Sequence, residues 1–389
     1  MFEKSTVPLR PFALRDNARM TSSPLRRALL LAGLGVLTPG HAQVPQTQTP
    51  QTLRPRTLVF PRDHGSHPEL QTEWWYVTGH VEAGGQTYGF QVTFFRSRVD
   101  GTQAMQSRFA AKQLLFAHAA VTDLQGKRLL HDQRLEREAF GLARADPDKM
   151  ALEIKGWSLM SSGAGNPASY QVRVQTEAQT GAFTLDLNLV PSQPVLLQGD
   201  RGLSRKGPLP EQASYYYSLP QLQAAGTLVL EGRRLQVAGR AWLDHEWSDA
   251  LLHPQAVGWD WIGMNLKDGS ALTAFQLRDK EGKPLWDGGS FRSNKGLLFI
   301  FKQGEVVFSR QKSWKSPQSQ ANYPVEWIVR TPADFYTVKA LIPNQELDSR
   351  RSTGTIYWEG LSDLMDSNGQ HVGRGYLEMT GYAKPLRLS

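Results

Sequence analysis

The sequence predicts an all-β protein that contains an internal duplication, and three observations support this class. No long stretch of the 389 residues keeps the 3.6-residue hydrophobic period of an amphipathic helix. The 35 Gly and 23 Pro divide the chain into many short alternating runs, which are typical of strands separated by turns. Two segments, 185 residues apart, repeat one strand-turn-strand pattern. The length itself favours two domains.

Residues 1–42 predict a secretory signal peptide. Arg26-Arg27 precedes an apolar run of ten residues, which is too short to span a bilayer, and Gly40 and Ala42 occupy the −3 and −1 positions of a cleavage site. The paired arginines suggest the twin-arginine route, and a membrane anchor is the alternative. We therefore expect export across the inner membrane into the periplasm.

Two further features belong to this end of the chain. Met20 would give a leader of ordinary length, so it is an alternative start. Residues 43–57 are rich in Pro, Gln and Thr and have no means of forming a core, so we expect a disordered linker there.

Composition excludes several classes of function. The formal net charge of +8 falls to +4 without the leader, because residues 1–42 hold six of the 44 basic residues and two of the 36 acidic ones. No basic run longer than two residues remains, whereas nucleic-acid binding needs a concentrated basic face. The absence of cysteine excludes disulfides, thiolate metal sites and cysteine nucleophiles.

The duplicated segments each predict a β-hairpin. From Trp74 to Phe95, aromatic and β-branched residues alternate with small or polar ones on both sides of Gly84-Gly85, a turn signal. The segment from Trp259 to Leu277 aligns with it without a gap. The aligned pairs are Trp74 with Trp259, Tyr76 with Trp261, Val77 with Ile262, Val81 with Leu266, Gly84 with Gly269, and "FQV" at Phe90 with "FQL" at Phe275. These matches in one register indicate a duplicated β unit.

The candidate ligand-binding residues open these two hairpins. They are Glu73, Trp74, Trp75, Tyr76, Trp259, Asp260 and Trp261. Glu73 and Asp260 each share a strand face with apolar residues, so each copy places a carboxyl group at the head of an apolar stripe. Burial among indole rings would raise the pKa of such a group and make it a general acid. The alternative is that the tryptophans fill the base of a barrel and the acid pairs with an arginine.

The candidate catalytic residues lie between Leu235 and Leu252. As a strand, this segment has two faces: Val237, Gly239, Ala241, Leu243, His245 and Trp247 on one, and Ala238, Arg240, Trp242, Asp244, Glu246 and Ser248 on the other. The first face is apolar, so we expect it to point inward, with its small residues leaving space beside the His and Trp rings.

An inward histidine beside such a space can transfer a proton to an apolar ligand. We therefore take Asp244, His245 and Trp247 as the catalytic candidates. A core histidine bonded to a backbone carbonyl is the alternative interpretation. On the opposite face, Asp244 and Glu246 would meet solvent or make a supporting hydrogen bond.

Other catalytic and metal-binding motifs are missing from the sequence. It has no G-x-S-x-G, no P-loop, no G-x-G-x-x-G after a strand and no H-E-x-x-H. The two histidines of "DHGSHPE", Asp63 to Glu69, lie in a loop, and the adjacent His245 and Glu246 diverge on a strand. We expect neither a metal nor a cofactor.

Ten segments of the chain resemble the AttH/CrtC-like family of secreted lipocalin-like proteins. They are "DHGSHPELQTEWWYVTGHV", "YGFQVTFFRSR", "LLFAHAAVTD", "GDRGLSRKG", "YYYS", "GRAWLDHEWS", "GWDWIGMNLKDGS", "YPVEWIV", "YWEGL" and "GYLEMTGY", and they extend from about Phe60 to Tyr382. The resemblance implies two tandem lipocalin-like antiparallel β-barrels, which agrees with the duplication. We place the N-terminal barrel at 58–250 and the C-terminal barrel at 251–389.

One branch of this family is carotenoid 1,2-hydratase, which adds water to a terminal isoprenoid double bond without a cofactor. The chain resembles that branch in Asp-His-x-Trp, here Asp244, His245 and Trp247, but it lacks the Tyr-x-Asp that follows some twenty-five residues later. The nearest acid there is Asp279. The chain is more similar to the branch of predicted secreted hydrolases, which is often linked to export-type ABC transporters.

These features together predict a secreted protein that binds an apolar or amphipathic ligand of the lipid or isoprenoid type at or between its barrels. Hydratase or hydrolase chemistry on that ligand is an alternative, and a glycan-binding module is a second one. The expected partners are the small apolar or lipid ligand, an ABC transporter of the cell envelope and the membrane surface, but no nucleic acid.

Overall fold

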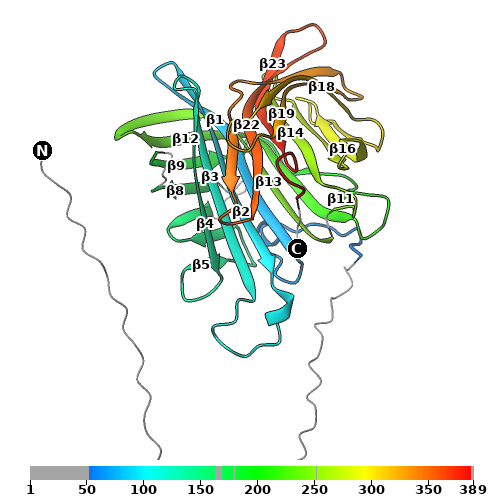
Figure 1. Cartoon of the computed structure of the whole chain (residues 1–389). Helices are drawn as coiled ribbons and strands as arrows, with labels where there is room; N and C mark the ends of the chain where they lie inside the picture. The colour runs from blue at the N-terminus through cyan, green and yellow to red at the C-terminus, as the bar shows by residue number, and fades with distance from the viewer. Residues whose placement is uncertain (1–51, 163–168, 178–180, 251, 387–389) are drawn as a thin grey trace, which may run out of the picture. The chain divides into compact units, whose positions relative to one another are not determined.

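The computed structural model describes residues 52–162, 169–177, 181–250 and 252–386. These residues form two antiparallel sheets and no α-helix, which confirms the predicted all-β class (Figure 1). Accordingly, no helix among them is long and apolar enough to cross a membrane. All of them belong to one compact unit, Thr47–Ser389, so the division into two independent domains stays a prediction.

The first sheet has thirteen strands, with the path β4-β3-β2-β1-β13-β12-β9-β8-β7-β6-β5 and with β10 and β11 paired to β12. Its strands are β1 (Thr72–Ala83), β2 (Gln86–Arg98), β3 (Gln113–Asp123), β4 (Arg128–Arg137), β5 (Ala143–Ala145), β6 (Ala151–Ile154), β7 (Trp157–Ser162), β8 (Ser169–Gln175), β9 (Phe183–Val190), β10 (Leu196–Leu197), β11 (Leu203–Arg205), β12 (Ala213–Leu230) and β13 (Arg233–Ala250). Two short 3₁₀-helices, η1 (Arg62–His64) and η2 (Asp100–Thr102), flank the first hairpin.

The second sheet has ten strands, with the path β17-β16-β15-β14-β23-β22-β20-β19-β18 and with β21 paired to β22. Its strands are β14 (Gly258–Leu266), β15 (Ala271–Arg278), β16 (Pro284–Arg292), β17 (Leu298–Phe301), β18 (Val307–Lys315), β19 (Asn322–Arg330), β20 (Phe335–Ala340), β21 (Glu346–Ser349), β22 (Thr355–Met365) and β23 (His371–Met379). The predicted boundary at 250/251 falls between the two sheets.

Both predicted hairpins are present, and each occupies the same place in its sheet. Strands β1 and β2 meet at Gly84 and Gly85, and β14 and β15 meet at a turn that contains Gly269; all three glycines have positive φ. In each sheet the first hairpin strand also pairs with the last strand, β1 with β13 and β14 with β23. This shared position agrees with the duplication that the sequence predicts.

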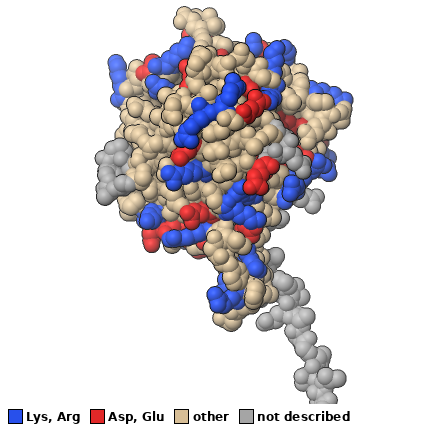
Figure 2. Space-filling model, turned by 90° about the vertical axis from the view of Figure 1, so that its left-hand side faces the viewer, with Lys and Arg blue, Asp and Glu red and all other residues tan. Residues whose placement is uncertain are grey.

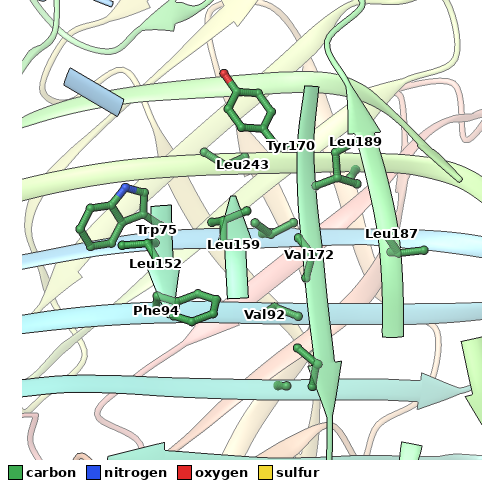
Figure 3. Packing of buried hydrophobic residues seen from close by; sticks show 14 of the residues in the cluster. Trp75, Val92, Phe94, Leu152, Leu159, Tyr170, Val172, Leu187, Leu189 and Leu243 are labelled. Atoms are coloured by element: carbon green, nitrogen blue, oxygen red, sulfur yellow. The ribbon is translucent and has the colours of Figure 1, made fainter. Parts of the chain in front are cut away.

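The first sheet curls into a nearly closed barrel around an apolar core. Figure 3 shows Trp75 of β1, Phe94 of β2 and Leu243 of β13 on one side of this core, with Leu159 of β7 and Val172 of β8 crossing them. The alternation of strand side chains produces this packing, because every second residue faces the interior. The second sheet surrounds a core of its own, which includes Ile262, Met264, Trp327, Trp358 and Leu377.

A third buried cluster joins the outer faces of the two sheets. It includes Tyr76 and Trp242 from the first sheet and Trp261, Phe275 and Tyr376 from the second. The second sheet therefore covers the outer face of the first sheet around Tyr76 and Trp242.

The predicted disordered linker is partly wrong. Residues 43–51 and the predicted leader lie outside the described residues, but 52–57 are ordered against the first barrel. Leu53 is buried, and the Arg56 guanidinium pairs with Asp63 at 3.0 Å and lies over the Tyr215 ring. An apolar anchor and an ion pair fix this segment, and composition alone does not reveal either.

One face of the molecule carries charges of both signs. Figure 2 shows the side that lies to the left in Figure 1, where Lys and Arg alternate with Asp and Glu over the first sheet. Basic residues are therefore not concentrated on this face.

Candidate functional site

A pocket of about 730 Å³ lies between the two sheets. Many polar and charged residues line it, together with an aromatic set that includes Trp74, Tyr76, Tyr216, Trp259, Trp261 and Phe275. The volume lies within the ~300–1,000 Å³ that small-molecule sites occupy.

Strand alternation determines which residues reach this pocket. On β1, Trp74 and Tyr76 point toward the second sheet, whereas Trp75 packs in the first barrel. On β13, Asp244 and Glu246 point toward the pocket, and in the register of the two strands they lie opposite Tyr76 and Trp74 respectively. The neighbouring strands therefore present two rings and two carboxyl groups on one patch.

Asp244 is buried and accepts three hydrogen bonds. The Ser218 and Tyr216 hydroxyls donate to it at 2.6 Å each, and the Trp242 indole N–H donates at 2.7 Å. Burial raises the pKa of Asp244 to about 7, although these three donors act in the opposite direction. Near neutral pH the carboxyl group is therefore present in both its protonated and its ionised form, as a general acid requires.

Two further carboxyl groups come from the second sheet. Burial raises the pKa of Glu378 on β23 to about 8, and the charges of Asp244 and Glu246 contribute. Burial and the charge of Glu378 raise the pKa of Glu359 on β22 well above its ordinary value. One pocket thus brings together acidic groups from both sheets.

Two buried polar atoms in this pocket lack a hydrogen bond that meets ordinary geometric limits. They are the Tyr76 hydroxyl and Glu359 Oε2, whose residues are 5% and 2% exposed. Burial raises the pKa of Tyr76, and the contact between the two groups, which has hydrogen-bond character but falls outside those limits, raises it further and acts to lower the pKa of Glu359. Buried polar groups are normally hydrogen-bonded, so these atoms can still accept or donate to a ligand.

The basic side chains at the pocket already have partners. Lys206 Nζ lies 3.0 Å from Glu246 Oε1 and sits over the Phe275 ring, 4.2 Å from its centroid. Arg96 pairs with Glu73 inside the first barrel, with 2.8 Å between Nε and Oε2. Among the described residues, no Lys or Arg forms a salt bridge with Asp244, Glu359 or Glu378.

Glu73 is fully buried in the first barrel rather than in this pocket. His67 Nδ1 and His245 Nε2 lie 2.7 and 2.8 Å from Glu73 Oε1, and Arg96 binds the other oxygen. Burial alone would raise the pKa of Glu73, but Arg96 and the two histidines hold it well below its ordinary range. The expected raised pKa is therefore wrong for Glu73, and the alternative of an acid paired with an arginine holds.

Asp260 repeats this pairing in the second sheet. Its Oδ2 lies 2.8 Å from Arg278 Nε, and its Oδ1 accepts a hydrogen bond from the Tyr382 hydroxyl at 2.9 Å. The two apolar stripes that the sequence predicts thus each begin at an inward carboxylate that an arginine neutralises.

His245 also lies in the interior of the first barrel. Its Nε2 contacts Glu73, its Nδ1 lies 3.2 Å from the Tyr217 hydroxyl, and its ring stacks on Trp75. The space expected at Gly239 is absent, because a Cβ there would lie 2.0 Å from the His80 carbonyl oxygen of β1. With both nitrogens bonded and the side chain fully buried, the ring has the contacts of a core histidine.

Trp247 lines a second, smaller pocket of about 400 Å³ on the far side of this network. Its ring stacks on His67 with 4.0 Å between centroids, and Arg56 and Asp63 complete the nearby wall. Neither His245 nor Trp247 lines the pocket between the sheets.

The ligand atoms of His67, Glu73 and His245 lie within 4.8 Å of one another, so these residues could be considered as a metal site. The surrounding charges do not suit a divalent cation. Arg96 already occupies Glu73, and hydrogen bonds to Asp63 and Glu73 outweigh burial and raise the pKa of His67, which favours its imidazolium form. A metal would need that histidine to be neutral.

A Ser–His pair at the mouth of the pocket resembles a nucleophile and its base. Ser352 Oγ lies 2.8 Å from His118 Nε2. However, the Ser352 hydroxyl donates to Gln133 Oε1 at 2.6 Å, and the Gln133 amide nitrogen is fixed by donating to the Asp348 carbonyl. His118 Nε2 must then carry a hydrogen and donate to Ser352, so this tautomer cannot take a proton from the serine.

The predicted site residues therefore separate into three places. Trp74, Tyr76, Asp244, Trp259 and Trp261 line the pocket between the sheets; Glu73, Trp75, His245 and Trp247 lie in the first barrel; and Asp260 lies in the second. The sequence analysis missed Tyr216, Glu359 and Glu378. The signal that could have found them is a polar or acidic residue inside the aromatic strands "YYYS", "YWEGL" and "GYLEMTGY".

Comparisons with known proteins agree on the fold. The family model described as AttH-like matches residues 51–382. The crystal structure of an AttH from Nitrosomonas europaea is similar at 42% identity with a TM-score of 0.78, covering 85% of this chain and 99% of that one. No curated protein matches the sequence significantly.

Two more distant structures share the fold alone. Kievitone hydratase from Nectria haematococca is 12% identical with a TM-score of 0.63, and 86% of this chain and 98% of that one are covered. CghA is 12% identical with a TM-score of 0.50, and the coverage is 88% and 98%.

Proposed function

The chain belongs to the AttH-like family, and from this premise we propose that it binds an apolar or amphipathic ligand of the lipid or isoprenoid type in the pocket between its two sheets. The observation that carries the proposal is the pocket itself, whose wall combines aromatic rings with buried polar groups. The leader predicted at 1–42 supports a location in the periplasm.

Binding can be tested with an isoprenoid alcohol such as farnesol, by isothermal titration calorimetry. Trp259→Ala removes a half-buried ring from the pocket wall and should weaken binding about tenfold, because a buried aromatic contact is worth ~1–2 kcal/mol. Trp314→Ala is the matched control, since Trp314 is also half-buried but lies on β18 away from the pocket. Equal affinities for the wild type and both variants would exclude this pocket as the site.

Acid-catalysed hydration of a carbon–carbon double bond is a second candidate, and Asp244 favours it. The protonated carboxyl group would give its proton to one alkene carbon and leave a carbocation on the other. The faces of Trp259 and Trp261 would stabilise that charge. Water would then add to the carbocation, and its released proton would return to the Asp244 carboxylate, so the cycle needs no cofactor.

Hydration can be tested separately from binding. Incubation with farnesol in H₂¹⁸O, followed by mass spectrometry, should yield a product that has gained one labelled water. Asp244→Asn should abolish this product, because the amide cannot supply the proton. Product formation at the wild-type rate by the variant would remove Asp244 from the reaction, whereas no product from the wild type would leave a binding protein for such ligands.

A further inference from the structure

The pocket between the sheets contains more carboxyl groups than its own basic residues pair with. Glu246 pairs with Lys206, but Asp244, Glu359 and Glu378 have no such salt bridge among the described residues. The three carboxyl groups come from β13, β22 and β23, so both sheets contribute to one cluster of acidic residues. Where these groups are ionised, a ligand with a negative head group is repelled.

Two buried polar groups in the pocket are also available to bond a ligand. Glu359 and the Tyr76 hydroxyl are buried, line the pocket and are each other's hydrogen-bond neighbours, although the contact falls outside ordinary geometric limits. Buried polar groups with poor hydrogen-bond geometry cost free energy, and a ligand group that bonds them would recover it. In its ionised form the Glu359 carboxylate can accept a further hydrogen bond and attracts positive charge.

The protein itself shows how an ammonium group is held in this pocket. Lys206 Nζ contacts Glu246 at 3.0 Å and lies 4.2 and 4.9 Å from the ring centroids of Phe275 and Tyr216. A carboxylate together with aromatic faces is the arrangement that recognises alkylammonium ligands. The pocket offers the same combination again, with Trp74, Tyr76, Trp259 and Trp261 beside the three uncompensated carboxyl groups.

We propose that the ligand of this pocket carries a positively charged alkylammonium group, which binds among Asp244, Glu359 and Glu378 while its hydrocarbon part lies against the aromatic wall. This inference rests on the proposed binding function and names the class of its ligand. It differs from the hydration chemistry, in which positive charge would exist only in a transient carbocation.

The charge on the ligand has a consequence for pH. Burial raises the pKa values of Asp244 and Glu378 to about 7 and about 8, so both groups are largely protonated at pH 6 and largely ionised at pH 9. A cation binds the ionised forms better and lowers their pKa values, so its affinity rises with pH across this range and its binding releases protons. A neutral ligand of the same length does not show this dependence.

The test compares three probes with the same chain length: decyltrimethylammonium, decanol and decyl sulfate, titrated by calorimetry at pH 6 and pH 9. At pH 9 the cation should bind at least about tenfold more tightly than decanol, and this ratio should be smaller at pH 6. Decyl sulfate should bind most weakly of the three. Equal affinities for cation and alcohol would overturn the inference and leave the proposed function intact. Binding of neither would contradict both.

Variants assign the preference to residues. Glu359→Gln and Glu378→Gln should each lower the ratio of cation to alcohol affinity toward one, and thermal melting shows whether each variant is folded. Glu326→Gln is the matched control, because Glu326 is partly buried on β19 outside the pocket, and it should keep the wild-type ratio. An unchanged ratio in the two folded pocket variants would refute the assignment.

Discussion

Asp244 and His245 are adjacent on β13, but their side chains lie in different compartments of the molecule. Asp244 faces the pocket between the sheets, where burial raises its pKa to about 7. His245 lies in the first barrel, 2.8 Å from Glu73, where burial lowers its pKa to about 4. A single peptide unit thus separates a group suited to proton transfer from a group that holds the barrel together.

Replacing His245 should therefore affect stability rather than ligand binding. His245→Gln disturbs a buried hydrogen bond to Glu73 and should lower the free energy of unfolding by ~1–3 kcal/mol, measured by urea denaturation. Farnesol affinity should stay within about twofold of wild type, since His245 does not line the pocket. A variant of wild-type stability that no longer binds farnesol would place the histidine in the working site after all.

The cost of His245→Gln should also depend on pH. The folded-state pKa of His245 is lowered from 6.5 to about 4, so below pH 6.5 the unfolded wild-type chain binds a proton that the folded chain does not. As pH falls, this proton binding by the unfolded chain lowers the stability of the wild type. It does not affect the variant, because glutamine does not titrate. The difference in unfolding free energy between wild type and variant should shrink from pH 7 to pH 4.5, and a growing difference would contradict the lowered pKa.

Replacing Asp244 should have the opposite pH dependence. Its folded-state pKa is raised from 3.8 to about 7, so between these values the folded chain holds a proton that the unfolded chain has released. The stabilisation that this group gives the wild type is fully present below pH 3.8 and is lost as pH rises toward 7. Its size is ~1.4 kcal/mol for each tenfold difference in proton affinity between the folded and unfolded chains. The stability of Asp244→Asn relative to wild type should therefore increase from pH 4 to pH 8. A flat or falling difference would show that the carboxyl group titrates normally.

The buried pair of Glu73 and Arg96 should be costly to break. Arg96→Met leaves Glu73 buried without its cation and should lower the unfolding free energy by ~3–5 kcal/mol. Arg173→Met is the matched control, because Arg173 pairs with Asp186 at 3.3 Å on the exposed surface, where such pairs are worth only ~0–1 kcal/mol. Adding Glu73→Gln to Arg96→Met should restore part of the lost unfolding free energy. If Arg96→Met and Arg173→Met lower the unfolding free energy by similar amounts, burial does not have the role assigned to it.

The leader yields a prediction outside the described residues. Cleavage after Ala42 should give a mature chain that begins at Gln43 and is recovered from the periplasm. Intact-mass measurement of the exported protein checks this, and disabling the twin-arginine pathway identifies the route. A full-length chain held in the membrane would contradict the prediction.

The sequence could predict the strands, the hairpins and the inward face of β13, because alternation is a local property. It could also have predicted the partner of Glu73: in a hairpin with a two-residue turn at Gly84-Gly85, Arg96 lies as far from the turn as Glu73, and the two are opposite in the register. That signal is present in the sequence.

The pocket between the sheets could not be predicted in the same way. Asp244 and Glu246 are polar and lie on the outer face of a barrel strand, so local pattern places them toward solvent. Only the second sheet covers that face, and it brings Glu359 and Glu378 from more than a hundred residues away. The absence of space beside Gly239 has a similar cause, since the neighbouring strand approaches it too closely. Packing between distant segments decides both outcomes.

The central claim is that the ligand occupies the pocket between the sheets, and native mass spectrometry of protein purified from its own cells tests it most directly. Two variants fill the two pockets in turn: Thr355→Trp projects into the pocket between the sheets, and Val59→Trp into the smaller pocket beside Trp247. We predict that wild type and Val59→Trp retain a bound apolar molecule and that Thr355→Trp loses it. Retention by folded Thr355→Trp together with loss by Val59→Trp would contradict the account.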